Sequence, residues 1–452
     1  MSLPDRRLSD PRQARAFHFV RCSYAGGEAQ LVYAFDDGPE LIERIGFPDA
    51  PALDDERNPA FNAALRLLHL IAGVSYYKAG VPERIVVEGE ALDAATAEFL
   101  DEVYLHGLAE FAYQNKLDLR GRISFPRGGV AASGLPATLH LPREALVPIG
   151  GGKDSLVSVE MLKGLGEPAT AVWIGDSALI AACAERTGLP TLNLKRKLAP
   201  ELFEYNQLGA WNGHIPVTAI NSAILLCAAI LYGYDAIAFS NERSASEATL
   251  EYDGQQVNHQ WSKGIDFERR LREHVRTHIA AGLDYFSLLR PWSELAVTRA
   301  FAQSTQYDNV FSSCNRNFRI RGERPADRWC GQCPKCHFVF LALAPFVAKP
   351  RLLKIFGRNL LDDATQAAGY DALLEYREHK PFECVGEGRE SRAAMYTLSQ
   401  RPEWREDALV ARFADEILPQ LDRGALALLP LLTPSHEHFL PLRLQRLLHE
   451  RG

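Results

Sequence analysis

Residues 146–157 read LVPIGGGKDSLV, a short apolar run that ends in three glycines and continues into the apolar spacing of a helix. Glycines at a strand-to-helix turn let backbone N–H groups approach a ligand closely, and the helix N-terminus behind them favours anions. Phosphate is therefore the expected ligand. The common GxxxxGK[ST] loop is excluded, because Asp154 follows Lys153 and Val147 stands where its first glycine belongs. A glycine turn without a ligand is the alternative.

The glycine segment resembles the PP-loop of ATP pyrophosphatases, whose usual pattern is SGGxDS. Gly151, Gly152, Asp154 and Ser155 match this pattern, whereas Gly150 replaces the first serine and removes one hydroxyl contact expected on pyrophosphate. Enzymes of this family cleave ATP between the α and β phosphates and adenylate a carboxyl or carbonyl oxygen. The resemblance implies that ATP is bound by Gly150, Gly151, Gly152, Lys153, Asp154 and Ser155.

Size, charge and cysteine content narrow the class of protein. A chain of 452 residues predicts two or three domains, and a net charge of −7 argues against general nucleic-acid binding. Residues 1–15 lack the apolar segment of a secretory signal. Eight cysteines, four of them clustered, then predict a reducing cytoplasm and a metal site. The longest uncharged run, residues 215–234, includes Asn221 and Ser222 and favours a buried helix over membrane insertion.

Hydrophobic periodicity predicts three domains. Residues 1–145 combine strands and long helices in an α+β pattern, and residues 346–452 are mainly helical. Residues 146–345 alternate strands with helices, which indicates a parallel sheet covered on both faces. With the PP-loop resemblance, the expected fold class is α/β with an adenine nucleotide alpha hydrolase-like core. The expected strands are 17–21, 30–35, 84–87, 146–149, 169–174, 191–194 and 236–239, and the expected helices are 58–77, 93–117, 156–164, 177–187, 218–232, 352–361, 364–376, 406–421 and 440–449.

Three further candidate ligands follow the ends of two other predicted strands in the central region. Gly175 comes directly after residues 169–174, and Ser240 and Asn241 come after residues 236–239. Ligands of parallel α/β sheets bind beyond the carboxyl ends of the strands. We therefore expect these three residues to join the glycine segment in one nucleotide site.

Acidic residues near these strand ends suggest Mg²⁺. Residues 241–247, NERSASE, resemble the acidic segment of PP-loop synthetases, in which a carboxylate helps the loop aspartate to hold the ion. The resemblance implies Asp154 as one ligand and either Glu242 or Glu247 as the second. Magnesium accepts one or two carboxylates together with phosphate oxygens. A solvated acidic loop is the alternative for each glutamate.

Two polar segments contain candidate proton-transfer groups. Residues 251–263 hold His259 and Lys263 in a stretch bounded by no predicted element, and residues 379–391 hold Cys384 among glycines and charges. Loops beside a binding crevice often contact the substrate. We select His259, Lys263 and Cys384 as catalytic candidates, with surface loops of no catalytic role as the alternative.

Four cysteines have the spacing of a metal site. Cys330, Cys333 and Cys336 follow a C-x2-C-x2-C pattern, and Cys314 lies upstream, so four thiolates are available for tetrahedral zinc. An iron–sulfur cluster is the rival, but the next cysteine of the ferredoxin pattern is replaced by Phe340. A similar cysteine cluster closes the sheet domain in the deazaguanine-forming branch of the PP-loop family. That resemblance favours a structural zinc ion, and a site without metal is the remaining alternative.

Arginines are concentrated between these cysteines. Five occur within thirteen residues of an acidic protein, and arginine binds diphosphate and carboxylate groups in a bidentate manner. A substrate-anion site and a solvated basic surface are both compatible with this charge. The set is Arg316, Arg319 and Arg321, which we select as substrate-anion candidates, followed by Arg324 and Arg328.

Taken together, the motifs resemble the family of UDP-N-acetyl-α-D-muramoyl-L-alanyl-L-glutamate epimerases over essentially the whole chain. The resemblance lies in PIGGGKDS (148–155), SNERSASE (240–247), VNHQWSK (257–263), WCGQCPKC (329–336) and KPFECVGEG (380–388). It implies an isomerase that uses ATP and Mg²⁺ to invert the terminal L-glutamate of a UDP-linked muramoyl dipeptide for peptidoglycan. An acyl-adenylate intermediate and release of AMP and diphosphate are also implied. The rivals are a PP-loop amidating or thiolating enzyme acting on a base or tRNA, and a non-enzymatic ATP sensor.

Overall fold

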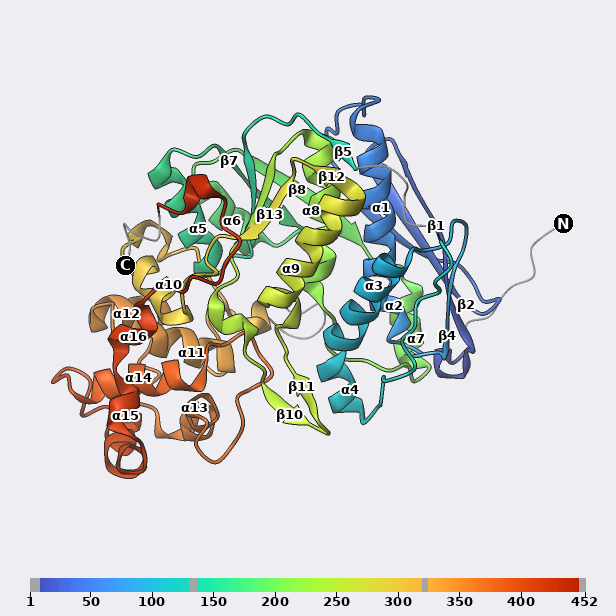
Figure 1. Ribbon diagram of the computed structural model, residues 1–452. Helices are drawn as coiled ribbons and strands as arrows, with labels where there is room; N and C mark the ends of the chain where they lie inside the picture. The colour runs from blue at the N-terminus through green and yellow to red at the C-terminus, as the bar shows by residue number, and fades with distance from the viewer. Residues whose placement is uncertain (1–8, 130–135, 319–323, 447–452) are drawn as a thin grey trace.

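The computed structural model describes residues 9–129, 136–318 and 324–446 of the chain. Within these ranges, nine strands form one mixed sheet in the order β13-β9-β6-β7-β8-β3-β2-β1-β4 (Figure 1). The strands are β1 (Ala16–Ala25), β2 (Glu28–Phe35), β3 (Leu41–Gly46), β4 (Arg84–Val87), β6 (Ala145–Pro148), β7 (Ala169–Ile174), β8 (Thr191–Lys197), β9 (Ala236–Phe239) and β13 (Asp284–Ser287).

The part of the sheet from β13 to β8 is parallel throughout. From β6 the chain moves outward to β7 and β8 on one side and returns to β9 and β13 on the other. The strand order therefore reverses between β6 and β9, and such a reversal opens a crevice at the carboxyl ends of the two strands. The glycine segment follows β6, so the topology places it at this crevice.

The amino-terminal strands extend the same sheet. Strands β1 and β2 form the expected hairpin, and β3 adds antiparallel to β2 and then to β8, with Arg44 opposite Lys197. A buried ion pair between Glu43 and Arg196 (Oε1–Nε 2.7 Å) crosses this junction. The sheet is thus continuous across residue 145, where the sequence changes from an α+β to an alternating pattern.

Sixteen helices surround the sheet in the described residues. They are α1 (Arg57–Ala72), α2 (Val74–Tyr77), α3 (Ala94–Gly107), α4 (Ala109–Asn115), α5 (Lys153–Leu165), α6 (Ala178–Arg186), α7 (Glu201–Gln207), α8 (Val217–Tyr232), α9 (Ile265–His274), α10 (Glu294–Phe301), α11 (Pro334–Leu343), α12 (Lys349–Phe356), α13 (Ala367–Leu374), α14 (Gly388–Ser399), α15 (Ala408–Arg412) and α16 (Leu428–Leu432). Two short sheets complete the set: β10 (Leu250–Tyr252) pairs with β11 (Gln255–Val257), and β5 (Ala137–Thr138) pairs with β12 (Ala280–Ala281).

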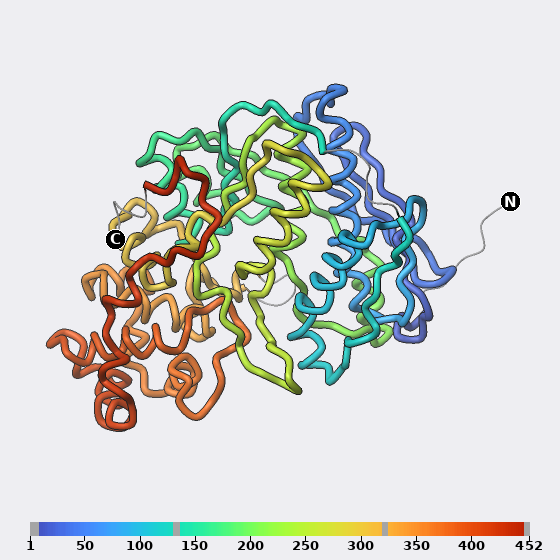
Figure 2. The backbone as a smooth tube through the Cα atoms, in the orientation of Figure 1, coloured from blue at the N-terminus to red at the C-terminus, as the bar shows by residue number. Residues whose placement is uncertain are grey.

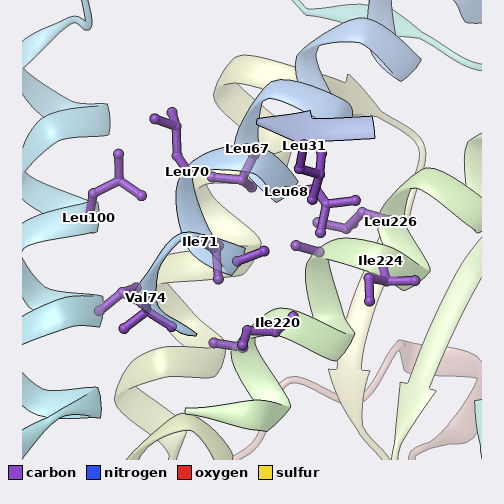
Figure 3. Close-up of a cluster of buried hydrophobic side chains, with 14 of the residues drawn as sticks. Leu31, Leu67, Leu68, Leu70, Ile71, Val74, Leu100, Ile220, Ile224 and Leu226 are labelled. Atoms are coloured by element: carbon purple, nitrogen blue, oxygen red, sulfur yellow. The ribbon is translucent and has the colours of Figure 1, made fainter. Parts of the chain in front are cut away.

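The two faces of the sheet bury separate cores. Successive side chains of a strand point to opposite faces, so Leu146 packs in one cluster with α8, whereas Val147 packs in the other with α5. Helix α8 lies against α1, and side chains from β2, α1, α3 and α8 meet in the first core (Figure 3). This confirms the buried-helix prediction for residues 215–234. No described helix combines the length and apolar character needed to cross a membrane.

The second core joins the parallel strands to the carboxyl-terminal helices. Helix α5 packs on α10, α10 packs on α11, and α11 contacts α13 and α14. The last segment then returns along the molecule to the sheet (Figure 2). There Arg443 lies 3.6 Å from Asp235 and 3.7 Å from Glu167. These ion pairs hold the turn around residue 443 near the amino ends of β7 and β9.

Most expected elements are present, and two of the expected carboxyl-terminal helices are corrected. Residues 406–421 do not form one helix, because α15 is followed by a π turn and a 3-10 turn that contains Pro419. Residues 440–449 contain only the 3-10 turn Leu442–Leu444 as far as Arg446, where the description ends. Pro441 precedes this turn, and Arg443 is drawn to the sheet by its ion pairs. Strands β3 and β13 and helices α9, α10, α11 and α14 were not predicted.

Candidate active site

A cavity of about 300 Å³ opens at the carboxyl ends of β6 and β9. It brings together the glycine segment, the residues after β9, and segments from the second half of the chain. Its lining includes Gly150, Gly152, Asp154, Ser155, Ser240, Asn241, Lys263, Ser312, Ser313, Lys335 and Cys384. A second cavity of about 570 Å³ adjoins it, shares Pro148, Ile149, Gly150, Asn221 and Phe318 with it, and includes Gly175.

The glycines fit a closely approached turn. Gly151 has φ +81°, in the left-handed region, and its carbonyl accepts a hydrogen bond from the Ser312 amide at 2.9 Å. A Cβ atom at Gly152 would lie 2.7 Å from Ser313 Oγ, so any side chain there would collide. At Gly150 a Cβ atom would meet nothing within 4 Å. The backbone at Gly150 therefore stays open to both cavities.

Lys153 does not line either cavity, although the sequence suggested it as a nucleotide ligand. Its side chain is buried, and its ammonium forms ion pairs with Asp154 and with Glu294 Oε2, the latter at 2.9 Å. Burial and repulsion by Asp154 raise the pKa of Glu294 to about 7. Lys153 therefore neutralises carboxylates beneath the glycine turn. Glu294 was missed by sequence reasoning, because the helix that it begins, α10, was not predicted.

The two glutamates proposed for Mg²⁺ differ in their surroundings. Glu242 is buried directly after Asn241, and burial together with repulsion by Asp154 raises its pKa. Glu247 has a half-exposed side chain and pairs with Lys380 at 3.4 Å. Only Glu242 is thus close enough to Asp154 for their charges to interact strongly.

The three catalytic candidates form one contiguous group with Glu110. Lys263 Nζ donates to Cys384 Sγ at 3.2 Å, and His259 Nδ1 pairs with a carboxylate oxygen of Glu110 from α4. His214 lies beside them, 3.7 Å from the same Glu110 oxygen, and its ring centre is 4.3 Å from that of His259. The structure therefore brings together residues from three distant parts of the chain. Glu110 and His214 lie in no motif, so no sequence pattern pointed to them.

Charge complementarity decides the protonation of this group. Burial would raise the pKa of Cys384, but the charge of Lys263 and a hydrogen bond with His259 hold it well below its usual value. Burial would lower the pKa of His259, yet its hydrogen bonds with Cys384 and Glu110 raise it to about 9. These pKa shifts favour a Cys384 thiolate that faces the imidazolium of His259 and the ammonium of Lys263. Burial and the charge of His259 lower the pKa of His214 to about 3, so this ring is neutral.

The four clustered cysteines converge beside the site. Their sulfur atoms all lie within 4.8 Å of one another, with Cys333 and Cys336 at 3.5 Å and Cys330 and Cys336 at 3.7 Å. A tetrahedral ion with zinc–sulfur bonds of about 2.3 Å holds its sulfurs about 3.8 Å apart, so the donor set fits zinc. A four-iron cluster needs its thiolates farther apart. Cys314 completes the group.

The cysteine group also positions cavity residues. Ser312 and Ser313, which touch the glycine turn, immediately precede Cys314. Lys335 lies between Cys333 and Cys336, and its ammonium donates to the Cys384 carbonyl and lies 3.8 Å from Glu294 Oε1. The cysteine group therefore positions Ser312 and Ser313 against the glycine turn and the Lys335 ammonium at the cavity.

The arginine candidates separate in the structure. Arg316 donates to Gln332 Oε1 at 3.0 Å, and Arg319 and Arg321 lie outside the described residues. Arg324 lines the second cavity. Arg328 donates from Nη1 to the carbonyls of Asp308 and Phe311 at 3.0 and 2.9 Å, so this side of its guanidinium supports the backbone.

Comparisons with known proteins cover nearly the whole chain. A family model for the MurL N-terminal domain matches residues 8–288, and one for the MurL C-terminal domain matches residues 310–427. A UDP-N-acetyl-alpha-D-muramoyl-L-alanyl-L-glutamate epimerase of Xanthomonas oryzae pv. oryzae is 61% identical over 96% of both chains. The enzyme of the same name from Salinispora tropica is 42% identical over 98% of this chain and 96% of its own.

The thiolate assignment predicts selective alkylation of Cys384. An ordinary cysteine with a pKa near 8.5 is about 3% ionised at pH 7, so a fully ionised thiol reacts roughly tenfold faster after allowance for its lower nucleophilicity. We expect iodoacetamide at pH 7 to label Cys384 about tenfold faster than Cys22, as followed by peptide mass spectrometry. Because the pKa is lowered, the rate stays high as pH falls below 8. A Cys384 rate that rises with an apparent pKa near 8.5 contradicts the assignment, and Lys263→Met is expected to move the profile in that direction.

Proposed function

The chain belongs to the MurL epimerase family, and on this premise we propose that it inverts the terminal L-glutamate of UDP-N-acetylmuramoyl-L-alanyl-L-glutamate. Its relatives are named as epimerases, and the enzyme is accordingly an isomerase of peptidoglycan precursor synthesis. The observation that carries the proposed mechanism is the shared cavity, where a glycine turn, carboxylates and a thiolate group meet. A cytoplasmic location is part of the proposal, because the site depends on reduced thiols.

We propose ATP as the activating co-substrate, bound as in the PP-loop enzymes. The glycine turn at the N-terminus of α5 suits phosphate groups, because free backbone N–H groups and the helix dipole both favour anions. The adjoining cavity, with Trp173, Ile174 and Leu198 in its wall, suits the adenosine. Both cavities include Gly150, the residue with free space above its backbone.

Asp154 and Glu242 are the residues that would hold Mg²⁺. Two neighbouring carboxylates with reduced access to water suit a divalent cation, because a bound cation relieves their repulsion. The ion would supply positive charge for the phosphates of ATP. Glu247 is left out of the proposed site because Lys380 pairs with it.

Adenylation makes inversion of the glutamate α-carbon possible. Removal of an α-proton beside a free carboxylate is unfavourable, because the new negative charge develops next to an existing one. Attack of the carboxylate on the α-phosphorus of ATP expels pyrophosphate and gives an uncharged acyl group, whose enolate forms more readily. Proton removal is then assigned to the catalytic group that contains His259, Lys263 and Cys384, since general acid–base groups contribute roughly 10²–10⁴ in rate. Hydrolysis of the activated acyl group completes the reaction.

A structural zinc ion is proposed for Cys314, Cys330, Cys333 and Cys336. The mutual sulfur distances support a single tetrahedral ion, and the Gln332 amide donates to Cys330 Sγ at 3.4 Å, as is common around metal-bound thiolates. Its role would be to fix Ser312, Ser313 and Lys335 in the cavity wall. No chemical step is assigned to the ion.

The reaction is tested directly by isotope exchange. Enzyme, ATP, Mg²⁺ and UDP-N-acetylmuramoyl-L-alanyl-L-glutamate in D₂O are expected to yield D-glutamate product with deuterium at the α-carbon and one AMP per inversion. Mass spectrometry and nucleotide chromatography measure both. Absence of AMP with this substrate contradicts the proposal. AMP accompanied by an amide in the presence of ammonia supports an amidating enzyme, and ATP binding without turnover supports a sensor.

The proposed Mg²⁺ site includes Glu242 and excludes Glu247, and matched substitutions of the two glutamates test this choice. We expect Glu242→Gln to lower kcat/KM for AMP release by about 10²-fold or more, because removal of a preorganised charged group typically costs that much, and to weaken the apparent Mg²⁺ affinity. The matched variant Glu247→Gln is expected to retain near wild-type kinetics. Steady-state rates over a Mg²⁺ titration make the comparison, and similar losses in both variants would overturn the assignment of Glu242.

Zinc content provides a separate test. The wild-type protein is expected to contain about one zinc per chain, and Cys333→Ser is expected to lose most of it and to unfold at a lower temperature, because structural zinc contributes directly to folding. Elemental analysis and thermal unfolding measure these effects, with Cys22→Ser as the control. Iron in place of zinc, or unchanged metal content in Cys333→Ser, would refute the proposed site.

A further inference from the structure

Cys384 is positioned more rigidly than its place in a loop suggests. Its carbonyl accepts a hydrogen bond from Lys335, and the carbonyl of the next residue, Val385, accepts one from Gln260 Nε2 at 3.3 Å. Two residues after Val385, Glu387 is the N-cap of α14 and forms a capping box with Glu390. The thiol is therefore fixed at the wall of the cavity that also contains Asp154.

The groups around this thiol have the order of a nucleophilic triad. His259 interacts with the Cys384 thiol, and Glu110 pairs with Nδ1 of the His259 ring. A nucleophile, a base and an orienting carboxylate in this order activate cysteine in acyl-transfer enzymes. Lys263 adds a positive charge 3.2 Å from the sulfur.

The same contacts argue against Cys384 as one of two opposed bases. Inversion by two bases requires groups on opposite faces of the α-carbon. Lys263 instead contacts the sulfur, and His259 interacts with the same thiol, so the three groups form one cluster. A single cluster of this kind is better suited to attack a carbonyl carbon than to deliver protons to two faces.

We propose that Cys384 forms a covalent thioester with the substrate glutamyl group. This inference rests on the proposed adenylation. The thiolate attacks the acyl carbon of the adenylate, a carbon–sulfur bond forms, the bond from that carbon to the phosphate oxygen breaks, and AMP leaves with the electron pair. Sulfur donates less electron density to a carbonyl than oxygen does, so the thioester acidifies the α-proton.

The rest of the cycle balances without a further reactant. Once the thiolate charge is consumed, His259 no longer faces an anion and can release its proton and take the α-proton. Water gives a proton to the opposite face of the enolate. A second water then attacks the thioester, the carbon–sulfur bond breaks with its electron pair on sulfur, and the thiolate and the free carboxylate are regenerated as two protons pass to solvent.

Single-turnover trapping tests the thioester. Excess enzyme is mixed with ATP, Mg²⁺ and the UDP-linked L-alanyl-L-glutamate substrate, quenched in acid and measured by intact mass. The expected wild-type adduct has the substrate mass minus water, maps to the peptide that contains Cys384 and is removed by neutral hydroxylamine. Cys384→Ser is expected to accumulate a hydroxylamine-resistant ester, whereas Cys384→Ala forms no adduct and loses α-deuterium exchange. Cys22→Ala is the matched control, with unchanged adduct and exchange.

Each outcome separates the thioester from the proposed function. AMP formation without an adduct in both wild type and Cys384→Ser overturns the thioester and leaves adenylation intact. Retained α-deuterium exchange in a folded Cys384→Ala variant, checked by circular dichroism, also overturns it. If the wild-type enzyme forms no AMP with this substrate, the proposed function fails instead.

Discussion

The candidate site depends on the ion pairs that the buried carboxylate of Glu294 forms with two lysines. This carboxylate pairs with Lys153 at the start of α5 and lies 3.8 Å from Lys335 in the cysteine group. A buried charge must be compensated, and loss of one partner of such a pair typically costs about 3–5 kcal/mol. Three segments far apart in the sequence are therefore held in one arrangement, and the glycine turn, the cysteine group and the wall formed by α10 become a single unit.

The fold was predictable where the signal is local. The parallel strands β6, β7, β8 and β9, the long buried helix α8 and the β1–β2 hairpin follow from apolar runs and their spacing. Strand β3 was missed, and with it the link to β8 that makes the sheet continuous; the strand is short, carries the charged pair Glu43 and Arg44 at its centre, and its pairing with β8 is long-range. The proposed division into three domains and the PP-loop assignment stay predictions.

The site was predictable where residue types occur in a spaced motif. The glycine segment, the four cysteines and Cys384 were found in this way, and the structure brings Cys384, His259 and Lys263 into contact. Glu110, His214 and Glu294 were not found, because a single acidic or histidine residue outside a motif has no pattern of its own. Their importance comes from what packs beside them. The distinction between Glu242 and Glu247 likewise required knowledge that Lys380 reaches only one of them.

The contact between Lys263 and Cys384 joins the two regions matched by the separate family models, residues 8–288 and 310–427. Neither region alone contains the thiolate together with the charges that stabilise it. Sequence changes in one region are consequently constrained by residues of the other. Recombination between diverged relatives near residue 300 would separate the thiol from two of the cations that face it and would divide the core that both regions share.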